Sequence, residues 1–89
     1  MMLQMVKFGN ILNSRPAGRE AALRAKQIIN GSNGEGIILD FSNVEVLTPS
    51  FADEFVTGLK EIYKDRNIKL QGFETNQVIR DTLIALKLI

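Results

Sequence analysis

The stretch from Val46 to Phe55 (VLTPSFADEF) places two hydroxyls, a proline and two carboxylates among apolar residues. A hydroxyl in such a place can accept a phosphate or act as a nucleophile, provided that a neighbouring base activates it. The sequence contains no His and no Cys, so imidazole bases, thiolate nucleophiles and the commonest zinc ligands are excluded. Ser50 has no Lys near it in the sequence that could serve as its base. We therefore expect a protein that is not an enzyme and that uses no metal and no cofactor.

The same residues also suit the start of a helix. Thr48 can cap it, and Pro49 is pre-set for the first helical position. Ser50 and Asp53 can then form hydrogen bonds in the first turn, and Glu54 complements the helix dipole. A phosphate on Ser50 or Thr48 would be stabilised there by free amide groups. A plain helix start is the preferred interpretation, and a modified hydroxyl is the alternative.

Neither Asp40 nor the pair Asp53 and Glu54 favours a catalytic role. Asp40 ends a predicted buried strand, where it can brace the following loop through backbone N–H groups, and Asn43 suits the turn. A lone carboxylate without a metal-ligand set or an acid–base partner has little catalytic meaning. Asp53 and Glu54 are consecutive, so on a helix they should point in different directions and form a solvated edge rather than a catalytic pair.

Three arginines, Arg15, Arg19 and Arg24, recur just before and along the first predicted helix. They can receive a phosphate or an acidic partner surface, because guanidinium binds oxygens in a bidentate manner. The alternative is a solvated helix face. The glycine-rich segment 31–36 (GSNGEG) lies between a helix and the following strand, whereas phosphate-binding loops run from a strand into a helix. We therefore reject it as a nucleotide motif.

The elements that must position these residues follow from hydrophobic periodicity and turn signals. Gly9-Asn10 favours a short hairpin, Pro16 a helix start, and Gly31 a left-handed helix end. The apolar run 36–41 is typical of a central strand that is buried on both faces. We expect strands over 3–8, 11–12, 36–41 and 68–73, and helices over 17–30, 48 to about 63 or 65, and 74 to about 87.

The predicted order is ββαβαβα. Strands separated by helices imply parallel pairing, so we expect an α/β sandwich with a small, mostly parallel sheet and helices packed on it. With 89 residues and no repeat or linker, a single domain over 1–89 is expected. Hydrophobic residues at 45%, charged residues at 24% and a net charge of +1 indicate neither a nucleic-acid nor a membrane partner. The start of the chain lacks signal-peptide features, so a cytoplasmic location is expected.

Helical spacing also predicts which side chains face the core. The inward face of the second helix is expected to hold Phe51, Phe55, Leu59 and Ile62, widened by Ala52, Val56 and Tyr63. On the first helix it is Ala17, Ala21, Ala25, Ile28 and Ile29, and on the last it is Val78, Ile79, Thr82, Leu83 and Leu86. Leu23, Ile84 and Leu88 fall outside these faces. If the protein forms a homodimer, we expect it to use the last helix or the first strand edge.

A family resemblance rests on Leu39-Asp40-Phe41-Ser42, on Val44 and on Ser50-Phe51-Ala52-Asp53-Glu54. This core resembles the STAS-like domain family of unknown function (DUF4325), which is related to the STAS domains of anti-sigma-factor antagonists. The segment Ser14-Arg15-Pro16 with Gly18-Arg19 is also similar to that family. The resemblance implies a STAS-like fold over essentially the whole chain. In antagonist-type STAS domains a Ser after the corresponding strand is phosphorylated by a partner kinase, and that position falls here on Pro49, which cannot accept a phosphate.

The resemblance implies a regulatory protein-interaction module that binds a partner such as a histidine-kinase-like ATPase. We expect the partner to contact Thr48, Ser50, Asp53 and Thr57, with Arg19 as a lesser candidate. Two other functions stay open. One is a small-ligand or nucleotide sensor at the edge from Asp40 to Ser50, because ligands meet open parallel sheets at the carboxyl ends of their strands. The other is a small hydrolase with Ser50 as nucleophile.

Overall fold

A parallel sheet forms the base of the computed structural model, which describes residues 1–32, 34 and 36–89. Within these residues the sheet has three strands, β1 (Met2–Gln4), β3 (Ile37–Asp40) and β5 (Ile68–Gln71), in the order β1-β3-β5. Met2 lies opposite Ile38, and Ile38 lies opposite Lys69. The central position of the predicted strand and the parallel pairing are therefore confirmed.

A second strand pair replaces the predicted hairpin, which is wrong. After β1 the chain makes a 3₁₀ turn, η1 (Met5–Phe8), and Met5 is fully buried. β2 (Ile11–Leu12) then pairs in parallel with β4 (Val46–Leu47) rather than with β1. The turn ends β1 early and sends the chain away from the main sheet, so β4 is added to the predicted order of elements.

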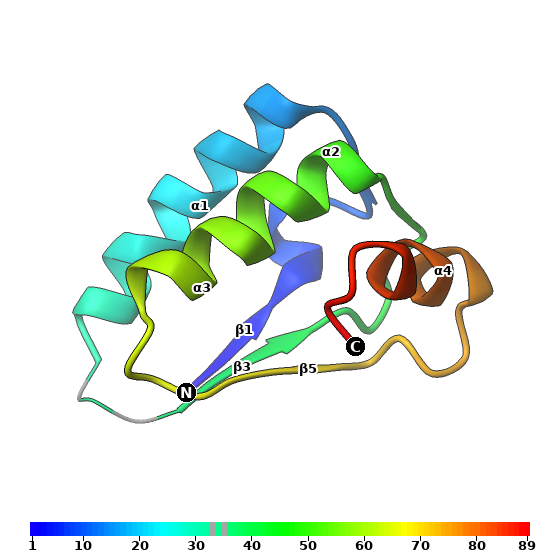
Figure 1. The fold of residues 1–89 in the computed structure, drawn as a ribbon. Helices are drawn as coiled ribbons and strands as arrows, with labels where there is room; N and C mark the ends of the chain where they lie inside the picture. Colours follow the sequence, from blue (N-terminus) through cyan, green and yellow to red (C-terminus); the bar gives the residue numbers. More distant parts are fainter. Residues whose placement is uncertain (33, 35) are drawn as a thin grey trace.

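The helices pack on one face of this sheet. α1 (Arg15–Asn30) lies beside a continuous helical segment made of α2 (Pro49–Ala52), a π turn η2 (Asp53–Thr57) and α3 (Gly58–Ile62) (Figure 1). α4 (Gln77–Ala85) lies beyond the carboxyl ends of β3 and β5 (Figure 1). The predicted α/β architecture is confirmed. None of the helices in the described part of the chain is long and apolar enough to cross a membrane.

The end of α1 differs from the prediction. Gly31 has a φ of −82°, so the helix does not close through a left-handed glycine. Instead the Ser32 hydroxyl donates to the carbonyl oxygen of Ile29 at 2.6 Å, which satisfies one of the free carbonyls of the last turn. The predicted glycine-rich loop also includes Asn33 and Glu35, which lie outside the described residues.

The opposite face of the sheet is uncovered in Figure 1. Leu3 and Leu39 point toward the helices and are buried, whereas Ile38 is only half-buried and Lys69 is exposed. Side chains alternate between the two faces of a strand, and all the helices drawn lie on one side. The prediction that the central strand is buried on both faces is therefore wrong.

The π turn changes which side chains reach the core. Phe51, Phe55 and Leu59 are buried as predicted, but Ile62 is 52% exposed while Tyr63 is buried. A π turn holds an extra residue, so the side chains after it are rotated relative to a regular α-helix. Three other residues predicted to face inward are also exposed: Ala17, Ile28 and Val78. Ile84 is exposed as predicted, while Leu88 is half-buried against the core.

Phe55 lies at the centre of this core. Its side chain is fully buried, and its ring stacks on Phe51 at 5.9 Å between centroids and meets Phe8 at 5.5 Å. Phe55→Ala should lower the free energy of unfolding by about 3–5 kcal/mol, because it leaves a cavity and removes both ring contacts. Urea unfolding measures this loss.

The matched control is Ile62→Ala on the same helical segment, which should change stability by less than about 0.5 kcal/mol because the side chain is exposed. Equal losses for the two variants would show that the buried face of this segment is wrongly assigned.

Candidate functional site

The start of α2 is fixed by two backbone-directed contacts at Thr48. Thr48 has extended backbone angles, and its Oγ1 accepts a hydrogen bond from the N–H of Phe51 at 3.4 Å. Its own N–H donates to the carbonyl oxygen of Leu12 at 2.9 Å, which ties the cap to β2. Pro49 follows as the first helical residue, where its missing N–H costs no hydrogen bond. Thr48 and Ser50 are both half-buried at this start.

Gly18 lets α1 approach this helix start closely. A Cβ at Gly18 would lie 2.8 Å from the carbonyl oxygen of Phe51 and 3.1 Å from the Cβ of Glu54. The buried face of α1 continues with Ala21 and Ala25, so small residues line the contact. Sequence reasoning placed Gly18 in the family resemblance but did not predict this close helix contact. The signal was available, since a glycine inside a helical stripe of small residues is typical of close helix packing.

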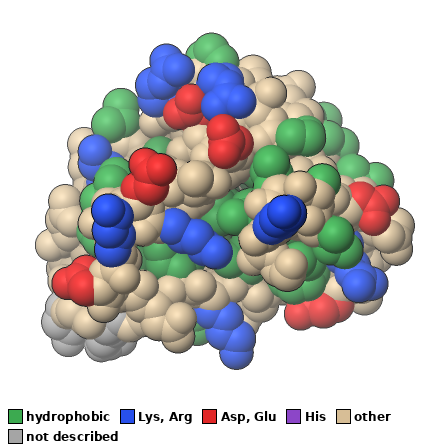
Figure 2. Space-filling model, viewed as in Figure 1, with side chains coloured by type: hydrophobic (Ala, Val, Ile, Leu, Met, Phe, Trp, Pro, Cys, Tyr) green, Lys and Arg blue, Asp and Glu red, His purple; other side chains and the backbone are tan. Residues whose placement is uncertain are grey.

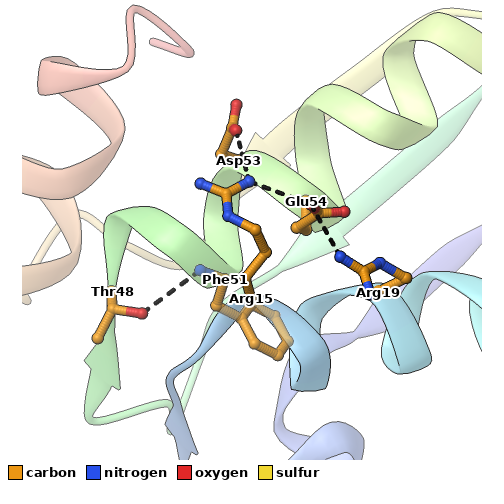
Figure 3. Close-up of polar contacts among 6 residues, drawn as sticks. All are labelled: Arg15, Arg19, Thr48, Phe51, Asp53 and Glu54. Atoms are coloured by element: carbon orange, nitrogen blue, oxygen red, sulfur yellow. Dashed lines mark hydrogen bonds and ion pairs between the residues drawn. The ribbon is translucent and has the colours of Figure 1, made fainter.

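Four charged side chains meet where the two helices touch. Arg15 Nη1 donates to Asp53 Oδ2 at 3.0 Å and to Glu54 Oε1 at 3.1 Å, and Arg19 Nη2 lies 3.7 Å from the same Glu54 oxygen (Figure 3). The side chains of Arg15, Asp53 and Glu54 are 47%, 44% and 25% exposed. Figure 2 shows basic and acidic side chains in contact at the top of the molecule, over the starts of α1 and α2.

This geometry corrects the expectation that Asp53 and Glu54 point in different directions into solvent. Both carboxylates turn toward Arg15, which comes from another helix, and the wide π turn begins at Asp53. Arg15 donates a hydrogen bond to each carboxylate, and both bonds raise the pKa of its guanidinium above the ordinary value. The bond to Asp53 has the larger effect, and the bond to Glu54 has the smaller one.

Arg24 and Thr57 lie outside the ion-pair cluster. The Arg24 guanidinium sits 5.2 Å from the centroid of the Phe8 ring, so the three predicted arginines do not converge on one anion site. Thr57 is half-buried at the end of the π turn, beside a shallow hollow of about 270 Å³ that also includes Asp53 and Glu61. The structure thus brings Arg19, Asp53 and Thr57 to one edge, with Ser50 and Thr48 at its start.

Asp40 contacts its own loop at the carboxyl end of β3. Its Oδ1 accepts hydrogen bonds from the N–H of Ser42 at 3.1 Å and from the Ser42 hydroxyl at 2.8 Å. Asn43 has a positive φ of 69°, which suits its place in the turn. Gly72, from the end of β5, has a φ of 81°, and a Cβ there would lie 2.6 Å from the Ser42 nitrogen. Gly72 was missed from the sequence because its close approach to Ser42 exists only in the folded sheet.

A pocket of about 530 Å³ opens beside this loop. Its charged lining residues are Glu45 and Glu74, and no Lys or Arg occurs among the described residues that line it. Asn76 closes one side, since its Nδ2 donates to the carbonyl oxygen of Val44 at 3.1 Å and its Oδ1 accepts from the N–H of Ile79 at 3.1 Å. No group of three or more potential metal ligands occurs among the described residues.

Residues 20–77 match the family model described as a STAS-like domain of unknown function (DUF4325). The chain belongs to this family. The match includes the Asp40 loop, Gly72 and the whole α2–η2–α3 segment of the STAS-like domain, whereas Arg15, Gly18 and Arg19 precede it. No curated protein and no solved structure matches the chain.

In this STAS-like domain Gly72→Ala should lower the free energy of unfolding by about 2–4 kcal/mol, because the new Cβ is strained at positive φ and collides with Ser42. The loss should appear as a lower urea midpoint. Gly34→Ala is the control, since a Cβ there meets nothing within 4 Å. A Gly72→Ala protein as stable as Gly34→Ala would contradict the close contact between β5 and the Asp40 loop.

Proposed function

We propose that this STAS-like domain is a non-catalytic regulatory module that binds a protein partner through one charged edge. The charged edge consists of Arg15, Arg19, Asp53 and Glu54, together with the adjoining Thr48, Ser50 and Thr57. The observation that carries the proposal is the exposed ion-pair cluster in which Arg15 holds two carboxylates and Arg19 approaches one of them.

The cluster suits recognition better than stabilisation. Exposed ion pairs contribute little to folding stability, because solvent screens them. At an interface the same charges select the partner, fix its register and speed its association. Arg15 is already held between Asp53 and Glu54, so less conformational entropy is lost when a partner docks. Both halves of the cluster stand on helices, which position them more firmly than loops would.

The expected partner class is a histidine-kinase-like ATPase, by analogy with the anti-sigma-factor antagonists that this family resembles. Pro49 occupies the usual phosphoacceptor position, so Ser50 and Thr48 are the hydroxyls through which a kinase would act. A phosphate on Ser50 would bring about two negative charges to the first turn of α2, next to Asp53 in the chain. Such a phosphate would make the charged edge more negative, and this would weaken docking to an acidic or apolar partner surface.

A small-ligand or nucleotide sensor at the carboxyl edge of the sheet ranks second. Glu45 and Glu74 line the pocket there, and their charge opposes the phosphates of a nucleotide. Asp40 already accepts two hydrogen bonds from Ser42, which leaves it less available to a ligand. A hydrolase based on Ser50 ranks last, since the sequence offers no His and no nearby Lys as its base.

The test is a titration of folded variants with a histidine-kinase-like ATPase from the same organism. Asp53→Lys should weaken binding by at least about tenfold, because it replaces the carboxylate that Arg15 holds with a like charge. Ser50→Asp should also weaken binding, whereas Ser50→Ala should bind nearly as the parent does. Isothermal titration calorimetry reports the dissociation constants.

Asp65→Lys is the matched control, since Asp65 is an exposed carboxylate outside the charged edge. It should bind like the parent protein. Equal affinity for the parent, Ser50→Asp and Asp53→Lys would remove this edge as the docking site. Ester turnover by the folded parent that is lost in Ser50→Ala would favour the hydrolase instead.

A further inference from the structure

β5 is an edge strand, because the order β1-β3-β5 leaves its outer side without a neighbouring strand among the described residues. The carbonyl oxygens of Asn67 and Gln71 accept hydrogen bonds from N–H groups in and next to β3. Backbone groups alternate in direction along a strand, so those of Ile68 and Leu70 point away from β3. They form no hydrogen bond with another described residue. The outer side of β5 therefore offers N–H and C=O groups with which a further strand can pair.

A basic hollow adjoins this edge. It encloses about 230 Å³ where the end of α3 meets the start of β5. Its charged lining residues are Lys60, Lys64 and Arg66, and no Asp or Glu lines it among the described residues. The Arg66 guanidinium lies 5.7 Å from the centroid of the Tyr63 ring, and its Nη2 donates to the Ser32 hydroxyl at 3.4 Å. Neither Lys60 nor Lys64 forms an ion pair with a described residue.

Positive charge also lies on the other face of β5. Ile68 lines the hollow on the helix side, so the next residue, the exposed Lys69, points to the uncovered face of the sheet. Figure 2 shows Lys and Arg side chains over the region where α3 and β5 lie in Figure 1. The acidic residues nearest in the chain, Glu61 and Asp65, do not line the hollow, and Glu61 lines the one beside the charged edge. The free side of β5 thus has basic side chains on both of its faces.

We propose that β5 binds an acidic peptide segment of another protein as an added strand. The backbone groups of Ile68 and Leu70 pair with the extended peptide, which then lies about 4.8 Å from β5. Side chains of an extended peptide alternate between its two faces, so acidic residues at every second position meet Lys60, Lys64 and Arg66. The main-chain hydrogen bonds give affinity, and the basic side chains select carboxylates.

The charge pattern favours an acidic partner over a second copy of this chain. Two copies that paired antiparallel about Lys69 would place two lysines directly opposite each other, which is destabilising. Lysine on an edge strand opposes such self-association. A polyphosphate or a nucleic acid would meet the same lysines but has no N–H and C=O groups spaced like those of a strand. This surface lies on α3 and β5, so it does not depend on the charged edge.

The test is an NMR titration of the full chain with an acetylated and amidated peptide of about seven residues, in which glutamate alternates with threonine. Concentrations to about 2 mM reach the weak affinity expected of a short peptide. The amide signals of Ile68 and Leu70 should shift, and both amides should exchange more slowly with solvent because they donate to the peptide. A peptide with lysine in place of glutamate should bind at least about tenfold more weakly.

Two methylated peptides test the strand pairing itself. One carries N-methyl groups on its glutamates and the other on its threonines, and only one of these two sets of amides faces β5. One methylated peptide should therefore bind at least about tenfold more weakly than the parent peptide, while the other binds nearly as well. Equal binding of the two would overturn the proposal. Slower exchange of the Ile68 and Leu70 amides with inorganic tripolyphosphate would also overturn it, because that anion cannot form a strand.

A pair of protein variants tests the role of charge. Lys64→Glu should weaken binding of the parent peptide by at least about fivefold, and Lys64 is exposed, so folding is preserved. Lys7→Glu is the matched control, since it makes the same charge change at an exposed lysine of η1 and should bind like the parent protein. Equal weakening by both variants, or unshifted signals of Ile68 and Leu70 in the parent protein, would contradict the proposed site.

Discussion

The contact of α1 with the start of α2 at Gly18 is the constraint on which the rest of this molecule depends. No side chain separates the two helices there, since even a Cβ would come within 2.8 Å of the Phe51 carbonyl oxygen. The buried Phe51 and Phe55 rings sit on the core side of this contact, and on the solvent side Arg15 and Arg19 reach Glu54. One close approach therefore sets both the packing of the core and the arrangement of the charged edge. If the helices moved apart, the aromatic core would loosen and Arg15 would lose its carboxylates.

The carboxyl edge of the sheet is held together by its own side-chain contacts. Open parallel sheets usually bind ligands there. In this protein Asp40 and Ser42 hydrogen-bond each other, Gly72 packs against them, and Asn76 ties the start of α4 to the same loop. These contacts make the edge a structural joint between β3, β5 and α4. α1 carries charged side chains on two sides: Arg15 and Arg19 of the ion-pair cluster on one, and Glu20 and Arg24 on the other.

Local signals in the sequence were enough to predict the long helices and the central strand. Pro16 and Pro49 mark helix starts, and the apolar run around Leu39 marks the central strand, because these features act on neighbouring residues. The short pair β2–β4 has two residues in each strand, too few for any periodicity to show. The π turn and the convergence of Asp53 and Glu54 were also missed, since Arg15 lies 38 residues before Asp53 and only tertiary packing brings them together. The family, by contrast, could be identified from the Asp40 loop and the Ser50–Glu54 segment, and the match over residues 20–77 confirms it.

The core and the charged edge are claimed to depend on this helix contact. The most direct test compares the free energy of unfolding of Gly18→Ala with that of Gly58→Ala. Both glycines lie in helices, where alanine normally stabilises by about 0.5–1 kcal/mol, and a Cβ at Gly58 meets nothing within 4 Å. We predict that Gly58→Ala gains about this amount, while Gly18→Ala loses about 1–3 kcal/mol through overpacking against Phe51 and Glu54. A Gly18→Ala protein as stable as Gly58→Ala would contradict the claim that the approach of α1 to α2 determines the core and the charged edge.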